Sequence, residues 1–190
     1  MYRNIEKSLL EWKNSKKRKP LLLSGARQTG KTYIIEKFAK EEYKDLIKIN
    51  FEKEPEICSF FEKNINPKTI INNLENYFNK RIIADDALLF FDEIQACPAA
   101  ITSLKYFCEE ARQYSVIGAG SLLGVMVNRK QKDKKFSFPV GKVDELKMYP
   151  MNFEEFLIAL NENILLKQMP FVIAQAEEYN NFKENKKYNW

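Results

Sequence analysis

The chain has 190 residues, a length typical of one domain with its own hydrophobic core. Hydrophobic residues make up 45% of it and charged residues 30%, and the formal net charge is +5. No apolar run approaches the roughly 18 residues that indicate a membrane span. Histidine is absent, which excludes Ser-His and Cys-His nucleophiles and histidine-ligated metal sites, so catalysis must use carboxylates, lysine and the backbone. The N-terminus lacks the apolar core of a signal peptide, and we therefore expect a cytoplasmic protein.

Cysteines and basic runs give weaker signals. Cys58, Cys97 and Cys108 are odd in number and far apart, so we expect reduced thiols rather than a disulfide framework or a zinc knuckle. Basic residues concentrate at 16–19 and 129–135, which is typical of solvated faces. Contact with nucleic acid stays an alternative, although no aromatic-interleaved basic stripe supports it.

The first predicted elements are a helix, a strand and a second helix. Residues 2–14 have apolar side chains at helical spacing, and Pro20 closes the basic loop that follows. A buried strand at 21–24 then enters a glycine loop. From Lys31 onward the apolar spacing again predicts a helix, which completes a strand, glycine loop, helix unit.

The middle of the chain repeats this alternation. A strand is predicted at 46–51, followed by a helix that Pro67 opens. A buried strand at 87–91 precedes a helix that begins at Pro98, and a short strand is expected at 115–117.

The last elements are a strand at 143–149 and a helix that Asn152 caps and that runs through Leu160. Strands that alternate with helices predict an α/β fold with a parallel sheet covered on both faces, which holds ligands at the carboxyl ends of its strands. We expect one domain over 1–160 and a partial C-terminal segment over 161–190.

The glycine loop matches the motif G-x-x-x-x-G-K-[ST] in full. Its residues are Gly25, Ala26, Arg27, Gln28, Thr29, Gly30, Lys31 and Thr32. The two glycines let successive backbone N–H groups turn inward around phosphates, and the helix N-terminus adds the positive end of its dipole. Lys31 is expected to reach the β- and γ-phosphates, and the Thr32 hydroxyl to bind magnesium. The loop therefore predicts a P-loop that binds ATP, or a close purine nucleoside triphosphate, with Mg²⁺.

Two carboxylates end the buried strand at 87–91. Asp92 is expected to hold the magnesium and Glu93 to orient or deprotonate the attacking water. A strand end where acids are merely tolerated is the alternative, which the upstream P-loop disfavours. The other acidic pair, at 85–86, precedes the strand, so we expect it in a turn at the opposite edge of the sheet.

A third candidate follows the strand at 115–117. The adjacent strand of a P-loop fold can place a polar residue between the attacking water and the γ-phosphate, and Ser121 is our choice. A glycine turn capped by serine is the alternative.

Together these residues resemble the prokaryotic AAA+-type ATPases whose ATPase domain is usually followed by a separate C-terminal domain of uncharacterised function. The resemblance is carried by 20–32, 90–95, 118–123, 138–142 and 149–157.

The resemblance implies an AAA+-like core with Lys31 and Thr32 as Walker A residues, Asp92 and Glu93 as Walker B residues and Ser121 in the sensor position. Relatives often have Gly-Arg where this sequence has Gly-Lys at 141–142, and a planar guanidinium is therefore not assumed there. The match fades about thirty residues before the last residue, so a truncated member is expected.

The leading functional hypothesis is an ATPase that uses hydrolysis to drive a conformational change in an attached domain or a protein partner. The alternative is a nucleotide-gated binding module with negligible turnover. A GTPase is disfavoured because the segment 79–82 lacks the aspartate of a guanine-reading N-K-x-D element. A small-molecule kinase is disfavoured because Arg112 and Arg129 do not group in one lid. Self-association is expected if a neighbouring subunit supplies an arginine, for which Arg129 is the first choice.

Overall fold

The computed structural model describes residues 2–121, 138–162 and 164–170. The chain divides into two compact units, of which the larger, Ile5–Pro150, contains all five strands. The smaller unit combines Met1–Asn4 with Met151–Trp190. The predicted domain boundary near residue 160 stays a prediction.

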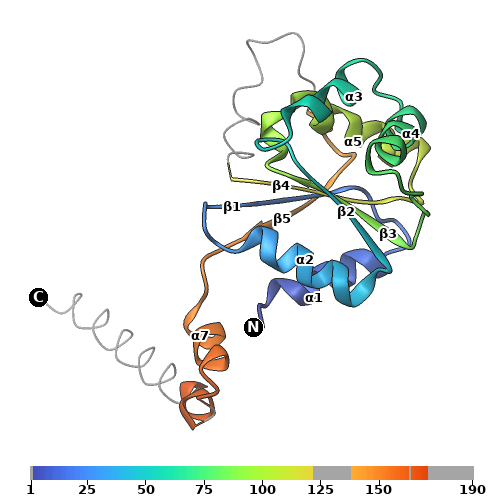
Figure 1. Ribbon diagram of the computed structural model, residues 1–190. Coiled ribbons are helices and arrows are strands. Elements are labelled where there is room, and N and C mark those ends of the chain that lie inside the picture. The colour runs from blue at the N-terminus through green and yellow to red at the C-terminus, as the bar shows by residue number, and fades with distance from the viewer. Residues whose placement is uncertain (1, 122–137, 163, 171–190) are drawn as a thin grey trace, which may run out of the picture. The chain divides into compact units, whose positions relative to one another are not determined.

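The strands form one parallel sheet in the order β2-β3-β4-β1-β5 (Figure 1). Their bounds are Leu21–Gly25 for β1, Asp45–Asn50 for β2, Ala87–Asp92 for β3, Ser115–Gly120 for β4 and Asp144–Met148 for β5. Asn50 pairs in register with Asp92, and Gly25 with Met148. Because all pairings are parallel, the P-loop and the acidic pair both follow strands at the same edge of the sheet.

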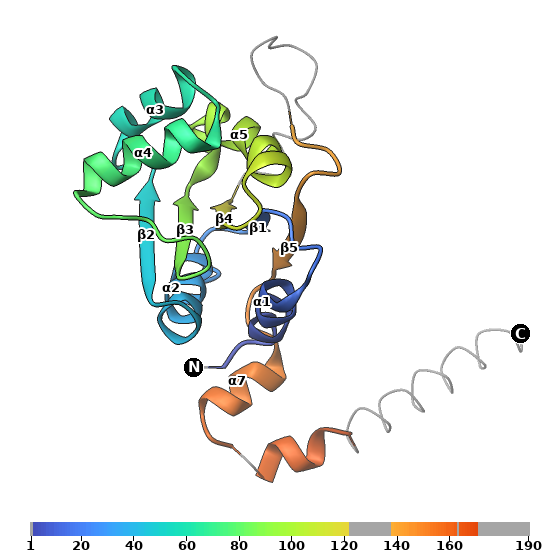
Figure 2. The ribbon, with the colours of Figure 1, turned by 90° about the vertical axis from the view of Figure 1, so that its right-hand side faces the viewer.

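Helices cover both faces of this sheet, as predicted (Figures 1 and 2). On one face lie α1, Ile5–Asn14, and α2, Lys31–Glu42; on the other lie α3, Cys58–Glu62, α4, Pro67–Phe78, and α5, Pro98–Glu110. Strand β3 shows why both faces are covered, since every one of its residues is buried. Leu88 and Phe90 pack in the core beside α1 and α2, whereas Leu89 and Phe91 pack in the core beside α3 to α5.

Local chemistry explains where the helices begin. Pro67 and Pro98 occupy first helical positions, where a missing N–H is harmless, and the Asn66 side chain accepts from the N–H groups of the first turn of α4. The acidic residues 85–86 lie in a turn before β3, as expected. The three cysteines are free thiols. Strand β4 is longer than the predicted 115–117, because its glycines stay paired within the sheet.

Three short elements were not predicted: the 3-10 helices η1, Pro55–Ile57, and η2, Ile94–Ala96, and the helix α3. Each spans less than two helical turns, so no apolar periodicity could reveal it.

In the smaller unit, α7, Phe153–Ala159, begins with a capping box between Asn152 and Glu155. The buried Glu155 carboxylate also accepts from the Asn4 backbone N–H at 2.7 Å and pairs with Arg3 at 3.2 Å. Burial acts to raise the pKa of Glu155, but these hydrogen bonds and the Arg3 charge outweigh it and lower the pKa. Among the described helices, none is long and apolar enough to cross a membrane.

Candidate nucleotide site

The P-loop connects β1 to α2, and its two glycines occupy positions that other residues would strain. A Cβ atom on Gly25 would lie 2.3 Å from the backbone oxygen of Met148 in the neighbouring strand β5. Gly30 has a φ of 89° at the N-cap of α2. Between them Ala26, Arg27 and Gln28 are exposed, and this stretch is the rim of the loop.

Lys31 lies inside the loop. It is buried, and its Nζ donates to the backbone oxygens of Gly25 at 2.9 Å and Ala26 at 2.7 Å. Burial lowers the pKa of Lys31, and the nearby carboxylates of Glu93 and Asp92 oppose this shift. Thr29 is also buried, and its hydroxyl donates to Ala26 at 3.0 Å, which braces the turn. The ammonium is thus held against the backbone of the loop.

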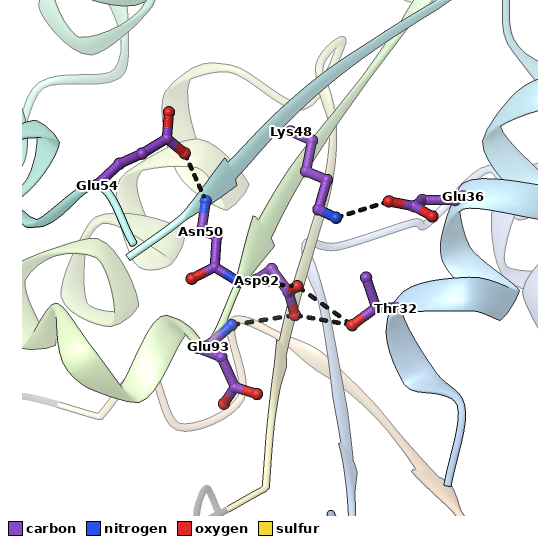
Figure 3. Close-up of polar contacts among 7 residues, drawn as sticks. All are labelled: Thr32, Glu36, Lys48, Asn50, Glu54, Asp92 and Glu93. Atoms are coloured by element: carbon purple, nitrogen blue, oxygen red, sulfur yellow. Dashed lines mark hydrogen bonds and ion pairs between the residues drawn. The ribbon is translucent and has the colours of Figure 1, made fainter. Parts of the chain in front are cut away.

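Thr32 and Asp92 lie far apart in the sequence but are hydrogen-bonded in the structure. The Thr32 hydroxyl donates to the Asp92 carboxylate at 3.1 Å and 3.3 Å (Figure 3). Asp92 is only 4% exposed, and burial raises its pKa against the opposing effects of Thr32 and Lys48. A hydroxyl and a carboxylate in contact form a donor set of the oxygen type that magnesium prefers.

This donor set is small. Within the described ranges, no group of three or more His, Cys, Asp or Glu side chains could hold a metal ion. Magnesium in nucleotide sites is usually bound by one or two protein ligands together with substrate phosphates, and Thr32 with Asp92 fits that pattern.

Asn50 is a site residue that the sequence analysis missed. Its Nδ2 donates to Asp92 at 3.2 Å, and its backbone N–H donates to Glu54 at 3.1 Å (Figure 3). Beside it on β2, Lys48 forms a 2.6 Å ion pair with Glu36 of α2. The available signal was a polar residue at the end of the second strand, but only the register of β2 with β3 brings it to the site.

Glu93 follows Asp92 with a left-handed backbone, φ 48° and ψ 44°, which is uncommon for a residue other than glycine. Its backbone N–H donates to Asp92 Oδ1 at 3.2 Å, and its carboxylate accepts from the Gln95 side chain. The turn places the second carboxylate of the pair beside the first and more exposed than it.

Ser121 lies directly after β4. Its hydroxyl is buried and has no hydrogen-bond partner among the described residues. In the described structure this hydroxyl is therefore not hydrogen-bonded to Lys31, Asp92 or Glu93, and its sensor role stays a prediction. Residues 122–124 and the candidate Arg129 lie outside the described residues.

A P-loop between β1 and α2, with an acidic pair at the end of β3 at the same sheet edge, defines a P-loop nucleoside triphosphatase fold. A family model described as an AAA domain matches residues 17–157. The chain therefore belongs to this AAA-type P-loop ATPase family, and the resemblance noted from its motifs is confirmed. Membership supports nucleotide binding and, at the level of the family, ATPase activity.

Among solved structures, a Walker-type ATPase of Pyrococcus abyssi matches with a TM-score of 0.48 and 20% sequence identity. The match covers 87% of this chain, which spans 59% of the length of that structure's chain. A search of curated proteins finds no match.

Proposed function

We propose that the protein binds ATP with magnesium and hydrolyses it to ADP and phosphate, and that this cycle drives a conformational change in an attached domain or a protein partner. The contact between Thr32 and Asp92 carries the proposal. It joins the hydroxyl that we assign to Walker A to the carboxylate that we assign to Walker B, with Lys31 and Glu93 each one residue away in sequence.

Different residues of the proposed site have different roles in this reaction. The backbone N–H groups of the loop and the Lys31 ammonium bind the β- and γ-phosphates. Thr32 and Asp92 would hold magnesium, which supplies neutralising charge to the phosphates when bound. The less buried Glu93 accepts a proton from water, because its carboxylate is not engaged by Thr32 or Asn50.

In the hydrolytic step the water oxygen forms a bond to the γ-phosphorus. The bond from that phosphorus to the β–γ bridging oxygen breaks, and its electron pair leaves with ADP. The proton from the water passes to the Glu93 carboxylate and is later released to solvent.

The direct test of the nucleotide site is Lys31→Ala. We expect it to abolish binding of ATP with magnesium, because it removes the charge that faces the β- and γ-phosphates. Isothermal titration calorimetry measures the affinity, and Lys40→Ala, an exposed lysine in the last turn of α2, is the matched control. Wild-type affinity in Lys31→Ala would show that the loop is not the site.

Binding without turnover is the competing function, a nucleotide-gated module. A phosphate-release assay of the wild type, with and without protein partners, separates it from an ATPase. Tight binding with no release under either condition would leave the module as the function.

A further inference from the structure

Gln95 is the side chain that holds Glu93. It lies in η2, the single 3-10 turn that follows Glu93, and its Nε2 donates to Glu93 Oε2 at 2.5 Å. The left-handed backbone at Glu93 turns the chain so that side chains two residues apart meet. The hydrophobic core fixes the position of this turn, because the Ile94 side chain is fully buried and packs against the backbone of Gly118 in β4.

The other half of the Gln95 amide is unsatisfied. Its Oε1 is buried and has no hydrogen-bond donor among the described residues. The reverse amide orientation would direct this oxygen at the Glu93 carboxylate, where two acceptors would repel. The orientation is therefore set by Glu93, and it leaves a buried acceptor to which the described residues supply no donor.

The Glu93 carboxylate and the Gln95 amide oxygen belong to hydrogen-bonded side chains, and one ligand with two donors can satisfy both acceptors. A water molecule has two hydrogens, and the attacking water of the proposed hydrolysis must donate one of them to Glu93. The Gln95 oxygen can receive the second, which fixes the direction in which the lone pairs of the water point.

We propose that Gln95 is a positioning residue for hydrolysis: its N–H group orients the Glu93 carboxylate, and its amide oxygen orients the attacking water. This inference rests on the proposed ATPase function. It assigns no role to Gln95 in binding ATP, because Gln95 forms no hydrogen bond with Lys31, Thr32 or Asp92 in the described structure.

Three variants test the role. Gln95→Met keeps the length of the side chain but removes both hydrogen-bonding groups, and Gln95→Glu keeps the acceptor oxygens but places a second charge against Glu93. Gln113→Met, at an exposed glutamine beyond the end of α5, is the matched control. We expect kcat to fall about 10- to 100-fold in Gln95→Met, as when one positioned group is lost, while KM for ATP stays within about twofold. Gln95→Glu should be slower than Gln95→Met because like charges repel.

Coupling to Glu93 distinguishes positioning from a structural role. Since the N–H group of Gln95 acts through Glu93, most of the loss caused by Gln95→Met should disappear in the Glu93→Gln background, and the double variant Glu93→Gln/Gln95→Met should be only slightly slower than Glu93→Gln alone. Additive losses, an increased KM with unchanged kcat, or a Gln95→Glu variant as fast as wild type would each overturn the inference. In the last two cases Glu93→Gln would still lose turnover, so the ATPase proposal itself would survive. If the wild type releases no phosphate, both proposals fail together, and that result is recognised before any variant is made.

Discussion

Asp92 and Glu93 are adjacent carboxylates with different surroundings, and this difference underlies the different roles proposed for them. Asp92 is buried and receives hydrogen bonds from Thr32, Asn50 and the Glu93 backbone. Glu93 is half-buried, and its carboxylate is held by Gln95. A carboxylate fixed from several sides suits a ligand, whereas a more accessible one can exchange protons with water.

Substituting each carboxylate by its amide should therefore give different defects. Glu93→Gln should keep ATP affinity but lower turnover 10²- to 10⁴-fold, roughly 3 to 5 kcal/mol of barrier, because the amide cannot accept the proton. Asp92→Asn should instead weaken the magnesium-dependent part of ATP binding. Titrations with ATP in the presence of magnesium or of EDTA, beside phosphate-release rates, measure both effects. Equal turnover in wild type and Glu93→Gln would mean that another group activates the water.

Asn50 should support Asp92 from the side opposite Thr32. Asn50→Ala removes one hydrogen bond to a charged group, worth about 1.5 to 3 kcal/mol in general, and we expect magnesium-dependent ATP affinity to drop about 10- to 100-fold. Binding measured without magnesium should change much less. Asn76→Ala, at an exposed asparagine of α4, controls for the change of residue type. An affinity loss of the same size without magnesium would assign Asn50 to the fold rather than to the metal site.

At the level of elements, η2 carries Gln95 and depends on a glycine in the neighbouring strand. A Cβ atom on Gly118 would come within 2.8 Å of Ile94 Cδ1 and 3.1 Å of Leu22 Cδ2, both in the buried core. The packing of β4 thus determines where the turn after Glu93 can lie.

Gly118→Ala should therefore lower both stability and turnover. Overpacking of this kind typically costs 1 to 3 kcal/mol, and the displaced turn should move Gln95 away from Glu93. Ile94→Val removes the methyl group that is contacted first, so the double variant should recover part of both losses. Thermal unfolding and phosphate release are the measurements. Full activity in the stable Gly118→Ala variant would show that η2 tolerates displacement.

The sequence predicted the long elements and missed the short ones for one physical reason. Strand β3 and helix α2 show clear apolar patterns over five or more residues, because each buries a complete face. Asn50 and Gln95 could not be identified this way. Asn50 reaches the site only through a strand register 42 residues distant in sequence, and Gln95 depends on a left-handed turn at Glu93 that no motif specifies. The P-loop could be identified from the sequence because the residues that form it are consecutive.

At the scale of the whole molecule, the described site brings together the residues proposed as metal ligands and base, but none of the described arginines pairs with them. In the described part of the chain, no arginine forms a hydrogen bond or ion pair with the side chains of Asp92 or Glu93. P-loop ATPases commonly receive such a group from a second molecule, and it can increase the rate 10³- to 10⁵-fold.

We therefore expect turnover per chain to increase with protein concentration in the presence of ATP. Phosphate release over a 100-fold concentration range, with mass measured by light scattering with and without ATP, tests this. Arg129→Ala is the first variant to examine, and Lys130→Ala in the same basic run is its control. Turnover that depends neither on concentration nor on Arg129 would indicate that each chain works alone.

The hydrogen bonds from Lys31 to Gly25 and Ala26 have a consequence for ligand choice. Any incoming molecule competes with two carbonyl groups of the protein for the same ammonium, so it must offer a stronger acceptor at that position. A β-phosphate offers such an acceptor, whereas adenosine and its monophosphate have no β-phosphate. We therefore expect the P-loop to select ligands by phosphate number through this internal competition, independently of how the base is recognised.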